Sequence, residues 1–343
     1  MQIDIAQWRA IHNQRQRFIY GWLAALLATA LVLSLTQGAI HINVFDSLSE
    51  LHQRVISEIR APRALMTMAT GAGLAICGLV LQAMCRNPLA DPGLVGVAQG
   101  AAFFASLAIL LSGLIVISPL ASLFFVPTMA FIGAAIALFL LLVIAGYRET
   151  MNTLVLILTG VAINAGAATL LGLITFIADD NTLRLITFWQ MGSYSGIDWP
   201  KAFLATAIVA IAIGIFWRQA NAIMLLQIGE KHAEYQGVDV TRLKQTLLIT
   251  VAIVTAVSVC FTGIVGFVGL VVPHICRMLA GTQLRILLPT VVLVGAALVT
   301  FADVAARIVI IPAELPIGLL TSALGVPFFL WLILREKRKF SRD

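Results

Sequence analysis

The sequence contains few charged residues. Only 11% of its 343 residues are Asp, Glu, Lys or Arg, whereas hydrophobic residues make up 60%. An ordinary soluble domain is about 25% charged, so most of the surface of this chain must face something other than water. This composition excludes an ordinary soluble domain and predicts an integral membrane protein.

Several motifs of catalysis and nucleotide binding are also missing. The chain has no Walker A pattern, G-x-x-x-x-G-K-[ST], so it cannot hold ATP in the usual phosphate-binding loop. It has no H-E-x-x-H or G-x-S-x-G motif, and the segment closest to the latter, GSYSG, carries Tyr194 at its centre. We therefore expect a chain that is not an enzyme.

Metal-binding patterns are missing too. The four cysteines show no C-x-x-C spacing and lie in or beside apolar segments, which favours buried hydrophobic roles over disulfides or metal ligation: Cys77, Cys85, Cys260 and Cys276. His274 stands alone, which favours a structural hydrogen bond over metal binding.

In place of these motifs the chain has long segments without any charged residue. A membrane-spanning helix needs about 20 apolar residues. Segments 18–45, 64–85, 151–178, 202–217, 286–302 and 315–334 can each supply one span. Residues 92–147 are long enough for two spans, with a break where Ser112, Gly113 and Pro119 cluster.

The remaining apolar run, 245–276, is long for one span and short for two. Both ends of the chain are basic, with Arg9, Arg15 and Arg17 at the start and REKRK from position 335, so both are predicted to be cytoplasmic and the number of spans to be even. A division at GIVGFVG, whose glycines weaken a helix, gives ten spans rather than nine.

The ten-span topology agrees with the distribution of charge. Segments 1–17, 86–91, 147–150, 218–244, 277–285 and 335–343 are then inside and carry 16 basic and eight acidic residues, against six basic and eight acidic residues outside. This is the positive-inside pattern. No small-residue cleavage pattern follows the first apolar run, so we expect a retained span rather than a removed signal peptide.

These boundaries predict one membrane domain, 18–335, between a cytoplasmic segment 1–17 and a cytoplasmic tail 336–343. Outside, residues 178–199 are too polar to span but carry Leu185, Phe188 and Trp189, which predicts a short interfacial helix able to cap a cavity.

Inside, the segment 218–244 contains the polar stretch LLQIGEKHAEYQGVDV. Gly229 and Gly237 bracket EKHAEYQ, about two helical turns, and the segment is longer than a simple connection needs. An ordinary solvated loop is the alternative to a docking helix. The predicted span centres hold no ionisable group of the kind an ion-coupled secondary transporter needs, so energy is expected to come from a partner docked here.

Five blocks in order along residues 60–335 resemble one family: IRAPRALMTMATGAGLAICGLVLQAMCRNPLADPGLVGVAQGA, WQMGSYSGIDW, LLQIGEKHAEYQGVDV, GFVGLVVPHICRMLAG and AELPIGLLTSALGVPFFLWLILR. This family comprises the permease subunits of type II ABC importers, which bring ferric siderophores, haem and vitamin B12 across the bacterial inner membrane. The resemblance implies an all-α membrane fold of ten helices, a second identical or paralogous permease subunit, two ABC ATPase subunits and a periplasmic binding protein. ATP and Mg²⁺ would bind to the ATPase, with no cofactor on this chain and no nucleic-acid partner.

The resemblance also implies roles for individual residues. The ATPase-coupling element would comprise Gly229, Glu230, Lys231, His232, Ala233 and Gly237. The binding protein would dock on Arg60, Arg63 and Arg307, for which snorkelling at the membrane boundary is the alternative. The cytoplasmic gate of the path would comprise Asn87, Leu89, Asn152 and Thr153.

The cargo is less tightly specified. The first fifty residues and the turn YRETMNT depart from the vitamin B12 member of the family. These departures leave the choice of cargo open. Because iron chelates are the commonest cargo of the family that the chain resembles, a ferric siderophore is favoured, with vitamin B12 or haem as the alternative.

Overall fold

All secondary structure in the described part of the chain is helical. The computed structural model describes residues 5–38, 42, 49–113, 119–146 and 151–340. Its elements are α1 (Ile5–Thr36), α2 (Glu50–Arg54), the π-helix η1 (Val55–Arg60), α3 (Ala61–Cys85), the 3₁₀ turn η2 (Pro92–Val95), α4 (Val97–Ser112), α5 (Pro119–Ile144), α6 (Thr153–Ile177), α7 (Asp180–Met191), α8 (Trp199–Arg218), α9 (Ala220–Ile228), α10 (Glu230–Tyr235), α11 (Val240–Thr262), α12 (Val268–Ala280), α13 (Leu284–Ile308) and α14 (Ile317–Phe340).

The helices account for the ten predicted spans. Within the described residues, eight helical stretches are long and apolar enough to cross a membrane, and α4 and α12 are shorter apolar helices. The division of 245–276 is confirmed, because Gly263 ends α11 with a φ of +70° and α12 begins at Val268. The run 92–147 likewise holds α4 and α5, although 114–118 between them lie outside the described residues.

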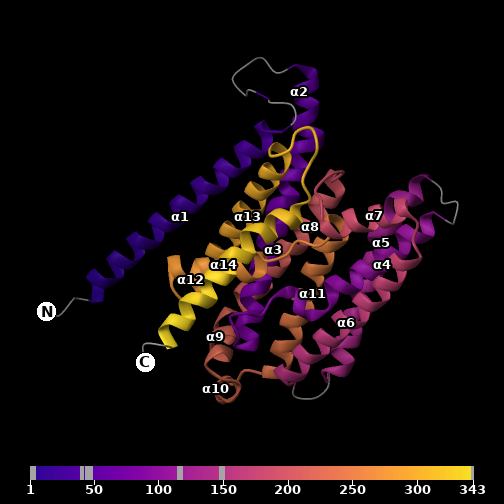
Figure 1. The fold of residues 1–343 in the computed structure, drawn as a ribbon. Helices are drawn as coiled ribbons and strands as arrows, with labels where there is room; N and C mark the ends of the chain where they lie inside the picture. The colour runs from indigo at the N-terminus through magenta and orange to yellow at the C-terminus, as the bar shows by residue number, and fades with distance from the viewer. Residues whose placement is uncertain (1–4, 39–41, 43–48, 114–118, 147–150, 341–343) are drawn as a thin grey trace.

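The long helices form one bundle with two distinct ends. Figure 1 shows α2 at one end and α9 and α10 at the other, with the start of α1 and the end of α14 nearer to α10 than to α2. The short helix predicted within 178–199 is present as α7.

Helix α3 is the centre of the bundle. It packs against α13, α8, α12 and α11, and almost all of its residues are buried. A Cβ added to Gly71 would lie 2.2 Å from the carbonyl oxygen of Gly295 in α13, and one added to Gly78 would lie 1.9 Å from that of Gly269 in α12. Glycine therefore allows these helices to touch backbone to backbone, as is common in membrane bundles.

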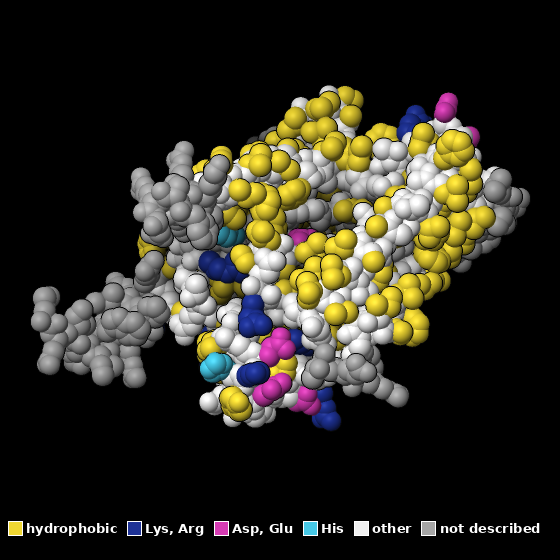
Figure 2. All heavy atoms as spheres, turned by 60° about the horizontal axis from the view of Figure 1, so that its bottom comes forward, with side chains coloured by type: hydrophobic (Ala, Val, Ile, Leu, Met, Phe, Trp, Pro, Cys, Tyr) yellow, Lys and Arg dark blue, Asp and Glu magenta, His cyan; other side chains and the backbone are white. Residues whose placement is uncertain are grey.

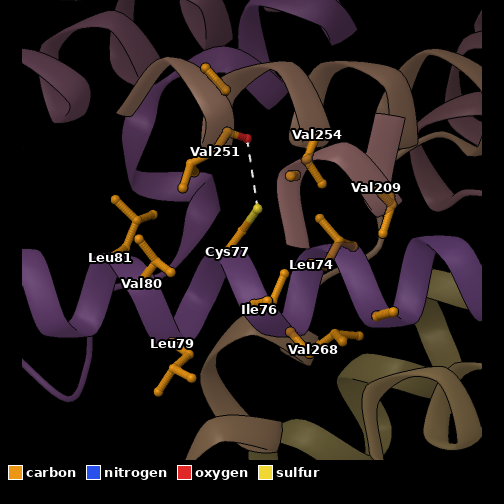
Figure 3. Close-up of a cluster of buried hydrophobic side chains, with 14 of the residues drawn as sticks. Leu74, Ile76, Cys77, Leu79, Val80, Leu81, Val209, Val251, Val254 and Val268 are labelled. Atoms are coloured by element: carbon orange, nitrogen blue, oxygen red, sulfur yellow. Dashed lines mark hydrogen bonds between the residues drawn. The ribbon is translucent and has the colours of Figure 1, made fainter. Parts of the chain in front are cut away.

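The cysteines have the apolar surroundings that their positions in the sequence predict. Figure 3 shows Cys77 of α3 pointing toward Val251 of α11, whose carbonyl oxygen is 4.0 Å from its sulfur. All four cysteines are free thiols; Cys85 is partly exposed, and Cys77, Cys260 and Cys276 are buried.

The ends of α1 and α14 differ from the prediction. Helix α1 begins within the predicted cytoplasmic segment and ends at Thr36 rather than near residue 45, while α14 continues past position 335 to Phe340. The early end of α1 has a physical cause. Arg60 donates to the carbonyl of Leu35 at 2.8 Å and Arg307 to that of Ser34 at 3.1 Å, so cations satisfy the last carbonyls of the helix.

Candidate coupling, gate and docking sites

The predicted docking helix is present as α10, directly after an additional helix, α9, that the sequence did not reveal. Gly229 precedes α10, and Gly237, with a φ of +81°, ends the turn that follows it. Ala233 is fully buried, whereas Lys231, His232 and Tyr235 are exposed. Ala233 thus packs inward, whereas Tyr235 faces away from the bundle. Figure 2 shows charged side chains gathered at this end of the molecule.

Glu230 joins α10 to two other segments. Its Oε1 lies 2.8 Å from the Nζ of Lys244, near the start of α11. The same oxygen lies 3.8 Å from the guanidinium of Arg86, which follows the last residue of α3. The first residue of the docking helix is therefore anchored rather than freely solvated.

Asn87 and Leu89 lie in the turn that follows α3. Arg86 adopts a left-handed conformation, with φ 49°, and ends the helix before Pro88. The Asn87 side chain accepts a hydrogen bond from the Leu89 amide at 2.9 Å, and Leu89 is 45% exposed. The structure thus gives Asn87 a local role in shaping the turn and leaves Leu89 accessible.

Asn152 and Thr153 start α6. The Asn152 side chain caps the helix by accepting from the Leu154 amide at 2.8 Å. The turn region after α3 packs on this helix, because the Asn164 side chain donates to the Gly93 carbonyl at 2.9 Å. The two predicted halves of the gate therefore belong to segments in contact with each other.

In the loop that follows α3, Asp91 is a partly buried carboxylate. It caps η2 by accepting from the Gly93 amide at 2.8 Å. Burial raises the pKa of the Asp91 carboxyl above its ordinary value, and the hydrogen bond from Gly93 opposes the shift only in part.

The three arginines predicted for docking lie together but are not exposed charges. Arg60, Arg63 and Arg307 are 5%, 6% and 6% exposed. The Arg63 guanidinium contacts Asp303 at 2.9 Å and Glu314 at 3.0 Å. Arg307 also pairs with Asp303, at 3.2 Å. Two acids and the end of α1 enclose the three arginine side chains. Three cations against two carboxylates still leave the cluster positive.

Helix α7 borders a cavity of about 410 Å³. Leu185 and Trp189 of α7 line it together with Ile109 of α4, Pro127 of α5 and Phe261 of α11. This agrees with the prediction that this segment caps a cavity.

Sequence reasoning missed four residues of these clusters: Arg86, Lys244, Asp303 and Glu314. For Asp303 a signal was available, since it stands four residues before Arg307 at the end of an apolar run, the spacing of a helical ion pair. No cluster of His, Cys, Asp or Glu suited to a metal ion occurs among the described residues. The ring of His274 instead packs edge-on against Phe328, with 5.9 Å between centroids.

Residues 26–335 match the model of the FecCD transport family. The chain belongs to this family. The hemin transport system permease protein HmuU of Yersinia pestis is 37% identical over 95% of this chain and 98% of its own length. The vitamin B12 import system permease protein BtuC of Serratia proteamaculans is 36% identical over 95% of this chain and 96% of its own.

A solved structure gives the same assignment. A metal-chelate type ABC transporter in an inward-facing conformation superposes with a TM-score of 0.81 at 32% identity, covering 93% of this chain and 99% of that chain. This FecCD-family chain is accordingly a multi-pass permease subunit of an ABC importer, and ATP hydrolysis lies with separate ATPase subunits. It is neither an enzyme nor an ion-coupled secondary transporter.

Proposed function

We propose that the chain forms, with a second permease subunit, the path through which a metal chelate delivered by a periplasmic binding protein enters the cell, driven by two ATPase subunits. On this proposal the complex lies in the bacterial inner membrane with both chain ends in the cytoplasm. ATP and Mg²⁺ bind to the ATPases, and the permease itself holds no cofactor.

For the cargo, we propose haem or a cobalamin rather than the ferric siderophore that the sequence favoured. The observation that carries this choice is the identity of 37% and 36% to permeases named for hemin and vitamin B12, along nearly their whole lengths. Titration of the cognate binding protein with haem, cyanocobalamin and a ferric siderophore tests it. Tight binding of the siderophore alone would reverse the choice.

We propose that α10 is the element that seats in the ATPase. Its exposed Lys231 and His232, its buried Ala233 and the glycines on either side support this role. Replacement of Ala233 by Trp should expel α10 from its seat and abolish co-purification of the ATPase subunits. Exposed Arg218→Trp, on the same side but outside α10, serves as the control. Unchanged association of the Ala233 variant would refute the proposal.

For the outer end, we propose that Arg60, Arg63 and Arg307 supply the positive field that orients an acidic surface of the binding protein. Long-range charge of this kind raises the association rate and is screened by salt. Exchange of Glu314 for Gln, which makes the cluster more positive, should speed docking at low salt, whereas Arg60→Gln should slow it. Rates insensitive to both changes would leave the arginines with a structural role only.

We propose finally that the path closes at the cytoplasmic end between the Asn87–Leu89 turn and the Asn152–Thr153 start of α6. The exposed Leu89 supports this position, as does the hydrogen bond from Asn164 of α6 to Gly93 in the loop after α3.

A further inference from the structure

Lys244 is a buried cation between the proposed coupling helix and the proposed gate. It is the fifth residue of α11, and its side chain is only 2% exposed. A lysine is almost never buried to this extent unless its charge is paired. The partners of Lys244 therefore define its role.

The ammonium group has three donors, and three acceptors surround it. Its Nζ lies 2.8 Å from Oε1 of Glu230, 2.8 Å from the carbonyl oxygen of Met151 and 3.4 Å from the hydroxyl of Thr153. Glu230 is the first residue of α10, and Thr153 is the first residue of α6. One side chain therefore joins the coupling helix to the start of the gate helix.

The other half of the proposed gate, the turn after α3, joins the same cluster. Arg86, next to Asn87 in the turn after α3, lies 3.8 Å from the Glu230 oxygen that Lys244 also contacts. Both proposed halves of the gate are thus linked to α10 through Glu230, one by Arg86 and the other by Lys244.

The contacts made by Lys244 are stronger than those made by Arg86. Arg86 is half exposed, so water screens its interaction with Glu230. Lys244 is buried, and a separation of Glu230 from it would leave an uncompensated charge away from water. Motion of α10 is therefore expected to carry α6 along more firmly than the turn after α3.

We propose that Lys244 is a positioning residue that transmits the displacement of α10 to the start of α6, so that movement of the ATPase opens or closes the gate. The inference rests on the proposed coupling function. Since Lys244 is buried, direct contact with the ATPase is not its role.

The test uses the complete transporter in liposomes, with one permease copy carrying spin labels at Tyr235→Cys in α10 and Leu154→Cys in α6; both positions are exposed, at 85% and 64%. The distance between the labels is measured with and without ATP. With Lys244 present, we expect the same distance in both states, because the two segments move together. In Lys244→Met the distance should differ between the states.

A second readout is uptake per ATP hydrolysed. We expect Lys244→Met to lower uptake per ATP about tenfold or more, because the variant loses a charge-assisted hydrogen bond. The ATPase subunits should remain associated. Lys244→Arg, which keeps the charge, should restore coupling. Arg242→Met is the matched control: Arg242 lies in the same turn, but its side chain is 85% exposed and pairs only locally with Asp239.

Three results would overturn the proposal: label distances that respond to ATP equally with and without Lys244, unchanged uptake per ATP in Lys244→Met, or loss of assembly in both Lys244→Met and the milder Lys244→Gln. If α10 does not seat in the ATPase at all, the Ala233→Trp variant will retain the ATPase subunits. That result would refute the coupling function of α10, whereas the three results above would refute only the role of Lys244.

Discussion

The buried carboxylate of Asp303 links several helices through ion pairs. It is 1% exposed and pairs with Arg63 of α3 and with Arg307 of its own helix, α13. Arg307 in turn donates to Ser34 and Gln37 at the end of α1. A single side chain thus connects three helices at one end of the bundle.

Asp303→Asn should therefore be strongly destabilising. Breaking a buried ion pair by neutralising one partner costs about 3–5 kcal/mol. Thermal unfolding of the detergent-purified protein measures the loss. Asp198→Asn is the control, since its pair with Lys201 is solvent-exposed and worth at most about 1 kcal/mol, and Asn can still cap α8. Equal shifts for the two variants would contradict this account.

Asp91 should make stability depend on pH. Burial raises the pKa of its carboxyl in the folded protein, so the folded state holds its proton to higher pH than the unfolded state does. As pH rises from about 4 through the raised pKa, the native protein should lose stability relative to Asp91→Asn, which keeps the η2 cap. The unfolding temperatures of the two proteins, measured between about pH 4 and about pH 8, test this expected loss of stability. A constant difference would show that the carboxyl is not perturbed.

At the scale of helices, contact between glycines fixes the distance of α3 from its neighbours. Gly71→Ala places a methyl group 2.2 Å from the Gly295 carbonyl oxygen, so α3 and α13 must separate. We expect a loss of about 1–3 kcal/mol, typical of overpacking. Gly214→Ala in α8 meets no atom within 4 Å and should be neutral or stabilising. Comparison of the two unfolding temperatures measures the difference.

The sequence predicts elements that depend on local signals. The division at Gly263 and the helix between Gly229 and Gly237 followed from residues adjacent in the chain. The end of α1 could not be predicted, because Arg60 and Arg307 from distant segments cap it. Lys244 was missed for the same reason: the Met151 carbonyl that it binds is 93 residues away. The site residues were located by family resemblance, and their burial could be known only from the fold.

At the scale of the whole molecule, the charge distribution predicts which end of the bundle faces the cytoplasm. In the permease expressed alone, with the partly exposed Cys85 replaced by Ala, an impermeant maleimide added to spheroplasts should label Thr187→Cys in α7. Tyr235→Cys in α10 should react only after permeabilisation. Both positions are exposed in the fold. The opposite pattern would invert the topology and remove α10 from reach of an ATPase.

The long helical stretch Glu50–Cys85 extends from the arginine cluster at one end of the bundle to the turn beside α10. Arg63 and Arg86 lie about 35 Å apart along it, at a rise of about 1.5 Å per residue. Since its backbone touches α13 at Gly71 and α12 at Gly78, it cannot bend at either point without displacing a neighbour. A displacement at one end of this helix should therefore tilt the whole helix and move its other end. If the binding protein docks at the arginines and the ATPase at α10, as proposed, binding on one side of the membrane and nucleotide affinity on the other should influence each other reciprocally.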